Sequence, residues 1–191
     1  MTIFLTKTDG PFARALAGSF TANGDTVTAD PSVSADFFID TTDFRDPGDD
    51  RAAGDGIDAE AAVRSFRANV SEPLALLSEV LPRMTGKKRI CFLSSRDGSV
   101  NWSTATTGYG RNMAKAALHQ ILTVTKNGLR ERGFTFRLFD PMTDKVPPEK
   151  AAASAYAYFT RDRFDDGPGR PDRDDENNLV IRDALGREVP W

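Results

Sequence analysis

The sequence predicts a single α/β domain in which a doubly wound sheet of about six mainly parallel strands lies between two layers of helices. Short apolar runs typical of buried strands alternate along the chain with longer segments of helical periodicity, which is the pattern of parallel βαβ units. The length of 191 residues suits one domain with a substantial core. We find no internal repeat and no second domain, so residues 1–191 are expected to fold together.

The amino-terminal part contains three expected strands. Residues 2–6 form a short apolar run, and a helix is expected over FARALAGSF, residues 12–20. Asn23-Gly24 marks a turn before a short strand at residues 26–29. The run DFFID, residues 36–40, predicts a buried strand, which an acidic, glycine-containing loop, FRDPGDDRAAGDG, follows.

A long amphipathic helix is expected over residues 58–84. Asp58 can cap its first turn, and the acidic residues nearby favour the positive end of the helix dipole. Apolar residues recur every three or four positions and predict one face in the core, namely Val63, Phe66, Val70, Leu74, Leu77 and Leu81.

The carboxyl-terminal part repeats the alternation. A buried strand at residues 90–93 precedes a helix over 107–132, which Gly133 is expected to cap. The run FTFRLF, residues 134–139, predicts a strand that ends at Asp140-Pro141. A helix over AAASAYAYF, residues 151–159, and a last strand at 179–181 flank a long polar run.

Composition narrows the class of protein. A net charge of -3 argues against general binding to nucleic acid or to a membrane surface. No apolar run approaches the roughly 18 residues of a membrane span, and no leader segment is visible, so we expect a cytoplasmic protein. The single cysteine, Cys91, is expected in the core of a protein kept reduced.

The sequence predicts no metal centre. The aspartates of DPGDD and PDRDD lack the glycine and glutamate spacing of a calcium loop, so both segments are expected to be solvated loops. His119 is the only histidine and has no partner ligands in the pattern, which favours a packed or interface side chain.

The segment from Arg89 to Leu118, RICFLSSRDGSVNWSTATTGYGRNMAKAAL, resembles the catalytic half of the short-chain dehydrogenase/reductase family, and specifically its C-factor-like branch. The ending Gly-x-x-x-Pro-Trp is also similar to small members of that family. The resemblance implies a Rossmann-like fold and places Asn69, Ser95 and Lys115 at three of the four active-site positions. The fourth position, which holds the proton-transferring tyrosine in the family, is Arg111.

The cofactor-binding end departs further from the family. Lys7, Pro11 and Ala13 stand where the resemblance implies three glycines, and Asp40-Thr41-Thr42-Asp43 replaces a neutral N-N-A-G segment. Pro11 also removes a backbone N–H donor at a helix start that would face a pyrophosphate. The run DFFID follows the first strand too closely for two full βαβ crossovers, since each needs roughly 30 residues or more. The nucleotide-binding half is therefore expected to be shortened. We therefore expect no cofactor, with NAD(P) as the alternative that the family implies.

Two residues leave alternatives open. Arg111 keeps its proton near neutrality, so it cannot act as a general acid. It can clamp an anion or form a salt bridge with an acidic residue such as Asp43. Tyr109 lies two positions away, about 200° around a helix, so a structural role is expected for it. A nucleophilic Ser95–Lys115 pair is the least favoured alternative.

The resemblance and these departures lead to one leading interpretation. The chain is predicted to be a family homologue that has lost ordinary hydride transfer and serves as a binding, regulatory or partner protein. One alternative is a divergent oxidoreductase that reduces a small carbonyl compound with Ser95, Lys115 and Tyr109. Another is a cofactor-free isomerase or lyase that holds an anionic substrate with Arg111 and Lys115. The resemblance also implies a homo-oligomer through helices 58–84 and 107–132, or association with a partner subunit of the same family.

Overall fold

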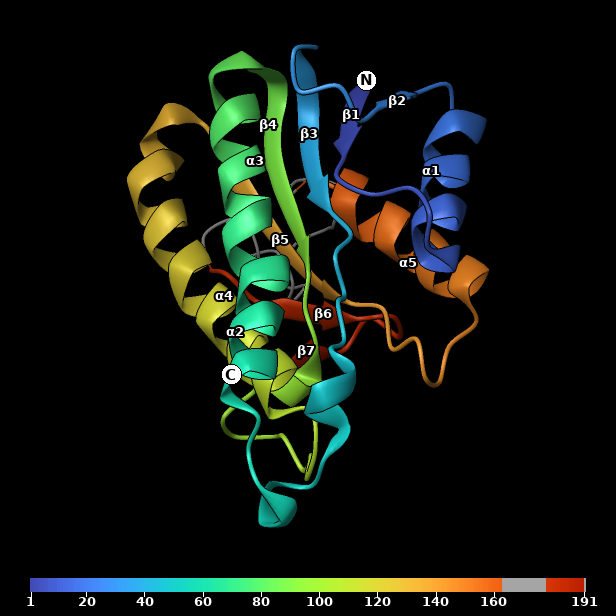
Figure 1. Ribbon diagram of the computed structural model, residues 1–191. Helices are drawn as coiled ribbons and strands as arrows, with labels where there is room; N and C mark the ends of the chain where they lie inside the picture. Colours follow the sequence, from blue (N-terminus) through green and yellow to red (C-terminus); the bar gives the residue numbers. More distant parts are fainter. Residues whose placement is uncertain (163–177, 191) are drawn as a thin grey trace.

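The computed structural model describes residues 1–162 and 178–190, and these form a three-layer α/β domain (Figure 1). Seven strands make one sheet in the order β2-β1-β3-β4-β5-β6-β7. All neighbouring strands are parallel except β6 and β7. The strands are β1 (Thr2–Leu5), β2 (Thr26–Thr28), β3 (Ala35–Asp40), β4 (Met84–Leu93), β5 (Thr135–Asp140), β6 (Ile181–Asp183) and β7 (Glu188–Val189).

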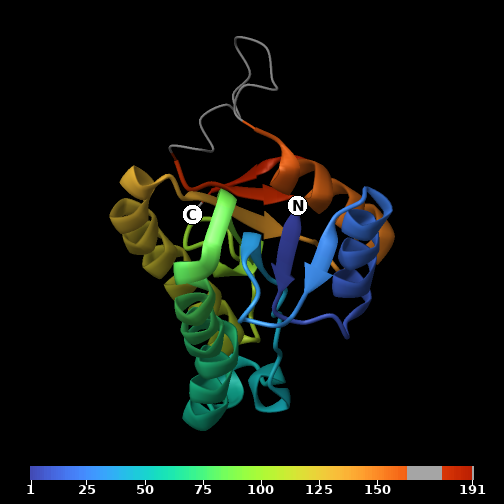
Figure 2. The same cartoon turned by 90° about the horizontal axis from the view of Figure 1, so that it is seen from above.

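Helices cover both faces of this sheet, as Figure 2 shows from above. One face carries α1 (Pro11–Ala22) and α5 (Pro148–Thr160), and the other carries α2 (Ala59–Phe66), α3 (Glu72–Val80) and α4 (Tyr109–Leu129). The fold class is therefore the predicted one. The seventh strand, β7, was not expected, because two residues after a turn give no periodic signal.

The central strand β4 shows how the sequence builds two cores. Side chains alternate across a strand. Ile90 and Phe92 accordingly pack among residues of α3 and α4, whereas Cys91 and Leu93 pack toward α1 and α5. Cys91 is completely buried, as predicted. Burial of each large apolar side chain, such as Ile90, Phe92 or Leu93, contributes about 1.5–3 kcal/mol to the free energy of folding.

The predicted helix over 58–84 is interrupted. Asp58 caps α2 by accepting a hydrogen bond from the Ala61 N–H, as expected. A π-helical turn, Arg67–Ser71, then separates α2 from α3. Val70 and Leu77 are buried, but Val63 is 67% exposed. The prediction that Val63 lies in the core is thus wrong, because α2 packs against α4 and buries Ala61 and Ser65, which lie on the opposite side of the helix from Val63.

The amino-terminal region is short, as the spacing predicted. Chain segment 29–34 joins β2 to β3 on the other side of β1 and contains no helix. Among the described residues, no helix is long and apolar enough to cross a membrane.

Candidate functional site

The candidate site lies where β3, β4 and β5 end at the carboxyl edge of the sheet. In open parallel sheets, ligands bind in the crevice outside these strand ends. Asp40, Ser94 and Asp140 stand at or just after the three strand ends, and α4 begins beside them. The sequence resemblance placed its active-site residues at this edge, and the structure brings Ser95, Arg111 and Lys115 to it.

Lys115 is fully buried and fastens two strand ends together. Its Nζ donates hydrogen bonds to the backbone carbonyls of Thr42, at 2.8 Å, and Leu93, at 3.1 Å. Burial lowers the pKa of Lys115, while the nearby carboxylates of Asp43 and Asp40 act in the opposite direction. The ammonium group that should contact a nicotinamide ribose is therefore enclosed by the chain's own backbone.

Asp40 lies beneath the same region and is also fully buried. Its Oδ1 accepts hydrogen bonds from the hydroxyls of Thr6 and Thr42, both at 2.8 Å. Burial raises the pKa of Asp40, and Lys115 and the hydroxyl donors only partly oppose this effect. Asp40 lines neither of the two cavities described below, so its role is in packing the strand ends.

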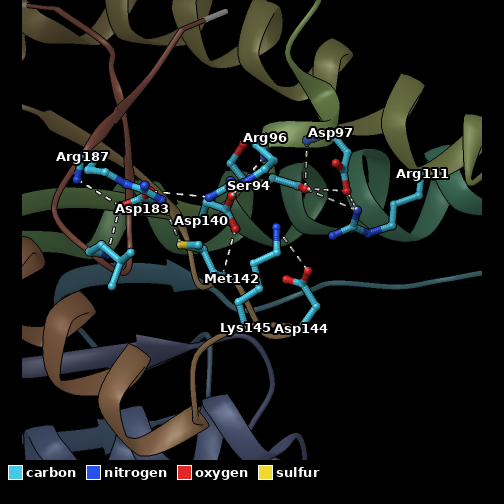
Figure 3. Close-up of polar contacts among 12 residues, drawn as sticks. Ser94, Arg96, Asp97, Arg111, Asp140, Met142, Asp144, Lys145, Asp183 and Arg187 are labelled. Carbon is cyan, nitrogen blue, oxygen red and sulfur yellow. Dashed lines mark hydrogen bonds and ion pairs between the residues drawn. The ribbon is translucent and has the colours of Figure 1, made fainter. Parts of the chain in front are cut away.

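Arg111 occupies the position of the family tyrosine and is held by three neighbours. Its Nε donates to Asp43 Oδ1 at 2.7 Å, and its Nη1 lies 3.4 Å from Ser95 Oγ and 3.5 Å from Asp97 Oδ2. The expected salt bridge with Asp43 is present. Burial raises the pKa of Asp43, but Lys115 and Arg111 together outweigh burial and hold this pKa below its ordinary value. Figure 3 shows the Arg111 side chain reaching Asp97.

Asn69 sits in the π-helical turn and clamps the loop that follows β3. Its Oδ1 accepts from the Phe44 N–H, and its Nδ2 donates to the carbonyls of Phe44 and Ser65, each at 3.0 Å. The family asparagine is implied to bend its helix, and the helix changes here to π geometry. The amide of Asn69 is engaged with backbone groups in all three contacts.

Asp49 is a site residue that the sequence reasoning missed. Its two carboxylate oxygens accept from the N–H groups of Gly110 and Arg111, both at 2.7 Å, and so cap the first turn of α4. A negative side chain at this end also complements the helix dipole. A Cβ on Gly110 would lie 2.7 Å from Ala62 Cα, so this close helix contact requires glycine.

The expectation that DPGDD is a solvated loop is wrong for two of its aspartates. Asp46 and Asp49 are both buried, and Asp46 makes a two-point ion pair with Arg64. The three aspartates in this short segment suggested that it is exposed to solvent. In the structure, backbone N–H groups and Arg64 supply the partners that allow the carboxylates of Asp46 and Asp49 to be buried. The second segment, PDRDD, lies outside the described residues.

Tyr109 points away from the candidate site. Its hydroxyl accepts a hydrogen bond from the Asp58 N–H, and its ring lines an apolar groove with Val63, Phe66 and Met113. The angular argument from the helix therefore predicted its direction correctly. His119 packs beside the Ser94 hydroxyl, and burial lowers its pKa to about 4. Within the described ranges, no group of three His, Cys, Asp or Glu side chains could hold a metal ion.

Two cavities open at this edge of the sheet. The larger, about 560 Å³, lies at the start of α1, and its lining includes Lys7, Pro11 and Ala13. The smaller, about 140 Å³, is lined by Ser95, Arg111 and charged neighbours. Four residues line both cavities, namely Asp43, Arg45, Pro141 and Thr143. The Arg111–Asp43 ion pair thus stands at their common wall.

A second chain of ion pairs begins at Arg96 and Asp140, which line the smaller cavity. Arg96 lies 3.4 Å from Asp140 and 3.5 Å from Asp183, and Arg187 bonds to Asp183 in turn (Figure 3). The sequence marked Asp140 only as a strand end. Its side chain in fact accepts from the backbone of Arg96, directly after Ser95, and so fixes the loop that carries the serine.

Comparison with known proteins gives a consistent relationship. No family model matches the chain. C-signal of Myxococcus xanthus, a member of the short-chain dehydrogenase/reductase family, is 30% identical over 145 residues, which cover 73% of this chain and 84% of that protein.

Solved structures share the fold along the whole chain. A carbonyl reductase from Pseudomonas aeruginosa PAO1 in complex with NADP has a TM-score of 0.78 at 19% identity and covers 100% of both chains. A putative short-chain alcohol dehydrogenase from Burkholderia multivorans has a TM-score of 0.78 at 13% identity, covering 100% of this chain and 98% of that one. The putative carbonyl reductase Sniffer of Caenorhabditis elegans has a TM-score of 0.74 at 11% identity and covers 100% and 99%. With this fold and its likeness to C-signal, the chain belongs to the short-chain dehydrogenase/reductase family, in its C-factor-like branch.

Proposed function

We propose that this protein has lost the ordinary NAD(P)-dependent hydride transfer of its family and acts as a binding, regulatory or partner protein. The observation that carries the proposal is the clamp on Arg111. A guanidinium held by Asp43, Ser95 and Asp97 stands where the family places a tyrosine. It keeps its proton near neutrality and cannot donate one to a developing alkoxide.

The residues that would hold a nicotinamide cofactor do not fit that group. Lys115 is 0% exposed and its Nζ is bonded to two backbone carbonyls, so contact with a ribose requires the surrounding chain to move. At the start of α1, Pro11 offers no N–H, and the side chain of Lys7 lines the space where glycines would leave room for a pyrophosphate. The residues at this edge therefore do not suit NAD(P) binding.

A cofactor titration tests this proposal. NADH and NADPH are titrated into the protein and followed by nucleotide fluorescence, with the NADP-binding carbonyl reductase of Pseudomonas aeruginosa as the positive control. We expect no saturable signal at micromolar nucleotide. Micromolar binding to the folded protein would overturn the proposal.

One feature favours the divergent-oxidoreductase alternative, namely the cavity of about 560 Å³ at the start of α1. Its volume lies in the usual range for small-molecule pockets. Steady-state assays over a panel of small carbonyl compounds discriminate the two proposals. Tyr109→Phe serves as the second arm, because an unchanged rate in this variant removes Tyr109 from any mechanism.

The cofactor-free isomerase or lyase alternative has less support. It requires Lys115 and Arg111 to hold one anion together, but only Arg111 lines the smaller cavity. Lys115 would need to leave the Thr42 and Leu93 carbonyls first.

We further propose that the protein is cytoplasmic and self-associates through α2, α3 and α4. An apolar groove of about 670 Å³ runs between α2 and α4, and Val63, Met113 and Val124 are exposed on these helices. Exposed apolar patches of this kind often mark protein interfaces. Val63→Asp should shift the mass measured by light scattering after gel filtration toward the monomer, whereas Val33→Asp, at an exposed position near β2, should not. Equal masses for both variants would contradict this interface.

A further inference from the structure

The smaller cavity contains an incompletely used arginine. Arg111 is 7% exposed, and its Nε and Nη1 atoms are bonded as described above. Among the described residues, none makes a hydrogen bond or ion pair with its remaining nitrogen, Nη2, and this atom is not among the fully enclosed polar atoms without a partner. Since Arg111 lines the smaller cavity, Nη2 is available to a ligand there.

A second cation lines the same space. Arg45 is exposed on the loop after β3 and makes no hydrogen bond or ion pair with the residues that the structure describes. Its charge acts on Asp43, which Arg111 already holds. Two guanidinium groups with free donors therefore line one cavity, and guanidinium forks match the planar, two-oxygen geometry of a carboxylate.

The remaining lining limits the charge and size of the ligand. The cavity volume of about 140 Å³ has room for only a few non-hydrogen atoms. The lining holds as many carboxylates as cations, namely Asp43, Asp97, Asp140 and Asp144 beside Arg45, Arg96, Arg111 and Lys145. The carboxylates repel a multiply charged anion such as phosphate more strongly than a singly charged one. The hydroxyl groups of Ser95 and Thr143 offer neutral hydrogen bonds beside the two arginines.

We infer that this cavity binds a small monocarboxylate, whose carboxylate group bridges Arg111 Nη2 and the Arg45 guanidinium. The inference rests on the proposed loss of hydride transfer, since it uses the tyrosine position as an anion receptor. In this site the second cation is Arg45, whereas the isomerase or lyase alternative used Lys115. Lys115 cannot serve here because backbone encloses its ammonium group.

The test uses propionate as the probe and neutral propionamide as its isosteric control. Binding is followed by amide chemical shifts in two-dimensional NMR of the intact protein. We expect saturable shifts at residues 95–97, 111 and 143 with propionate, in the millimolar range, and none with propionamide. Equal responses to both probes, or propionate shifts confined to other regions, would overturn the inference.

Variants locate the site. Arg111→Gln and Arg45→Gln should each weaken propionate binding by about tenfold or more, because each removes a charge-assisted contact. Arg45 is exposed, so its variant tests the site even where Arg111→Gln unfolds the protein. Arg51→Gln, an exposed arginine that does not line the cavity, should bind as the parent does. Unchanged affinity in Arg45→Gln would remove it from the site and refute the bridge.

The outcome is separable from that of the cofactor titration. A protein that binds neither NADPH nor propionate loses only the carboxylate inference. A protein that binds NADPH at micromolar concentration loses the proposed function, whatever propionate does. Phosphate at matched ionic strength gives the last arm, and tighter binding of phosphate than of propionate would refute the monocarboxylate assignment.

Discussion

The two halves of the carboxyl edge have changed in opposite ways. Around α4, the family residue types are largely kept, yet Asn69, Ser95 and Lys115 are bonded within the chain and only a small, charged cavity is left. Around α1, the glycines have been replaced, yet a cavity about four times larger is open. Retained residues therefore say little about retained chemistry, because what matters is whether their polar atoms are free.

The largest expected effect tests whether Lys115 is structural. Lys115→Ala should lower the free energy of unfolding by about 3–5 kcal/mol, because it leaves the buried carbonyls of Thr42 and Leu93 without their donor and removes the positive charge that opposes the burial of Asp40. Urea unfolding measures this change, with exposed Lys150→Ala as the control. A loss below about 1 kcal/mol would show that Lys115 is less enclosed than described.

A second test measures how stability depends on pH on the α4 side of the comparison. The pKa of His119 is lowered by burial from 6.5 to about 4, so the unfolded chain takes up its proton first as pH falls. This contribution is fully present above pH 6.5 and should be lost between pH 6.5 and 4, by roughly 3 kcal/mol in total. Urea unfolding across this window should give a shallower pH slope for His119→Gln. Identical slopes would contradict a neutral buried histidine.

A smaller effect is expected from the cap on α4. Asp49→Asn should cost about 1–2 kcal/mol of unfolding free energy, since it removes the negative charge that accepts from the Gly110 and Arg111 N–H groups. The neighbouring exposed residue gives a matched control, Asp50→Asn, which should change stability by less than about 0.5 kcal/mol. Equal effects of the two substitutions would argue against the cap.

The smallest expected effect is that of restoring the family tyrosine at position 111, which should not restore activity. Arg111→Tyr should show no NADPH-dependent reduction of carbonyl compounds above background, because Lys115 stays enclosed and the start of α1 keeps Lys7 and Pro11. Nucleotide absorbance over a carbonyl panel measures this rate. Clear turnover would break the comparison, since it would show that the α1 side still accepts a cofactor.

The sequence predicted most of the fold because strand and helix periodicities are local signals. Helix α4 lies where expected, with its ends shifted by two or three residues, whereas β4 begins at Met84, six residues before the predicted start. The direction of Tyr109 followed from helix geometry alone. Local patterns could not reveal that Lys115 faces backbone carbonyls, because its acceptors come from Thr42 and Leu93, far away in sequence.

The same limit explains the missed site residues. Asp49 sits in a polar stretch that reads as solvated, and its buried role depends on α4 docking against it. The exposed position of Val63 had a helical signal identical to that of buried Val70. The two positions differ in what their helical segments pack against, since α2 packs on α4 through Ala61 and Ser65, and the π-helical turn that holds Val70 follows it.

The short connection between β2 and β3 also determines which backbone the sheet presents to other molecules. It makes β2 the last strand on that side, and a terminal strand can pair with foreign chains and aggregate. Here the terminal strands are β2 with 3 residues and β7 with 2, too short to template an extended pairing. In the described part of the chain, the abbreviated sheet thus ends on both sides in strands that offer few free backbone groups to another chain.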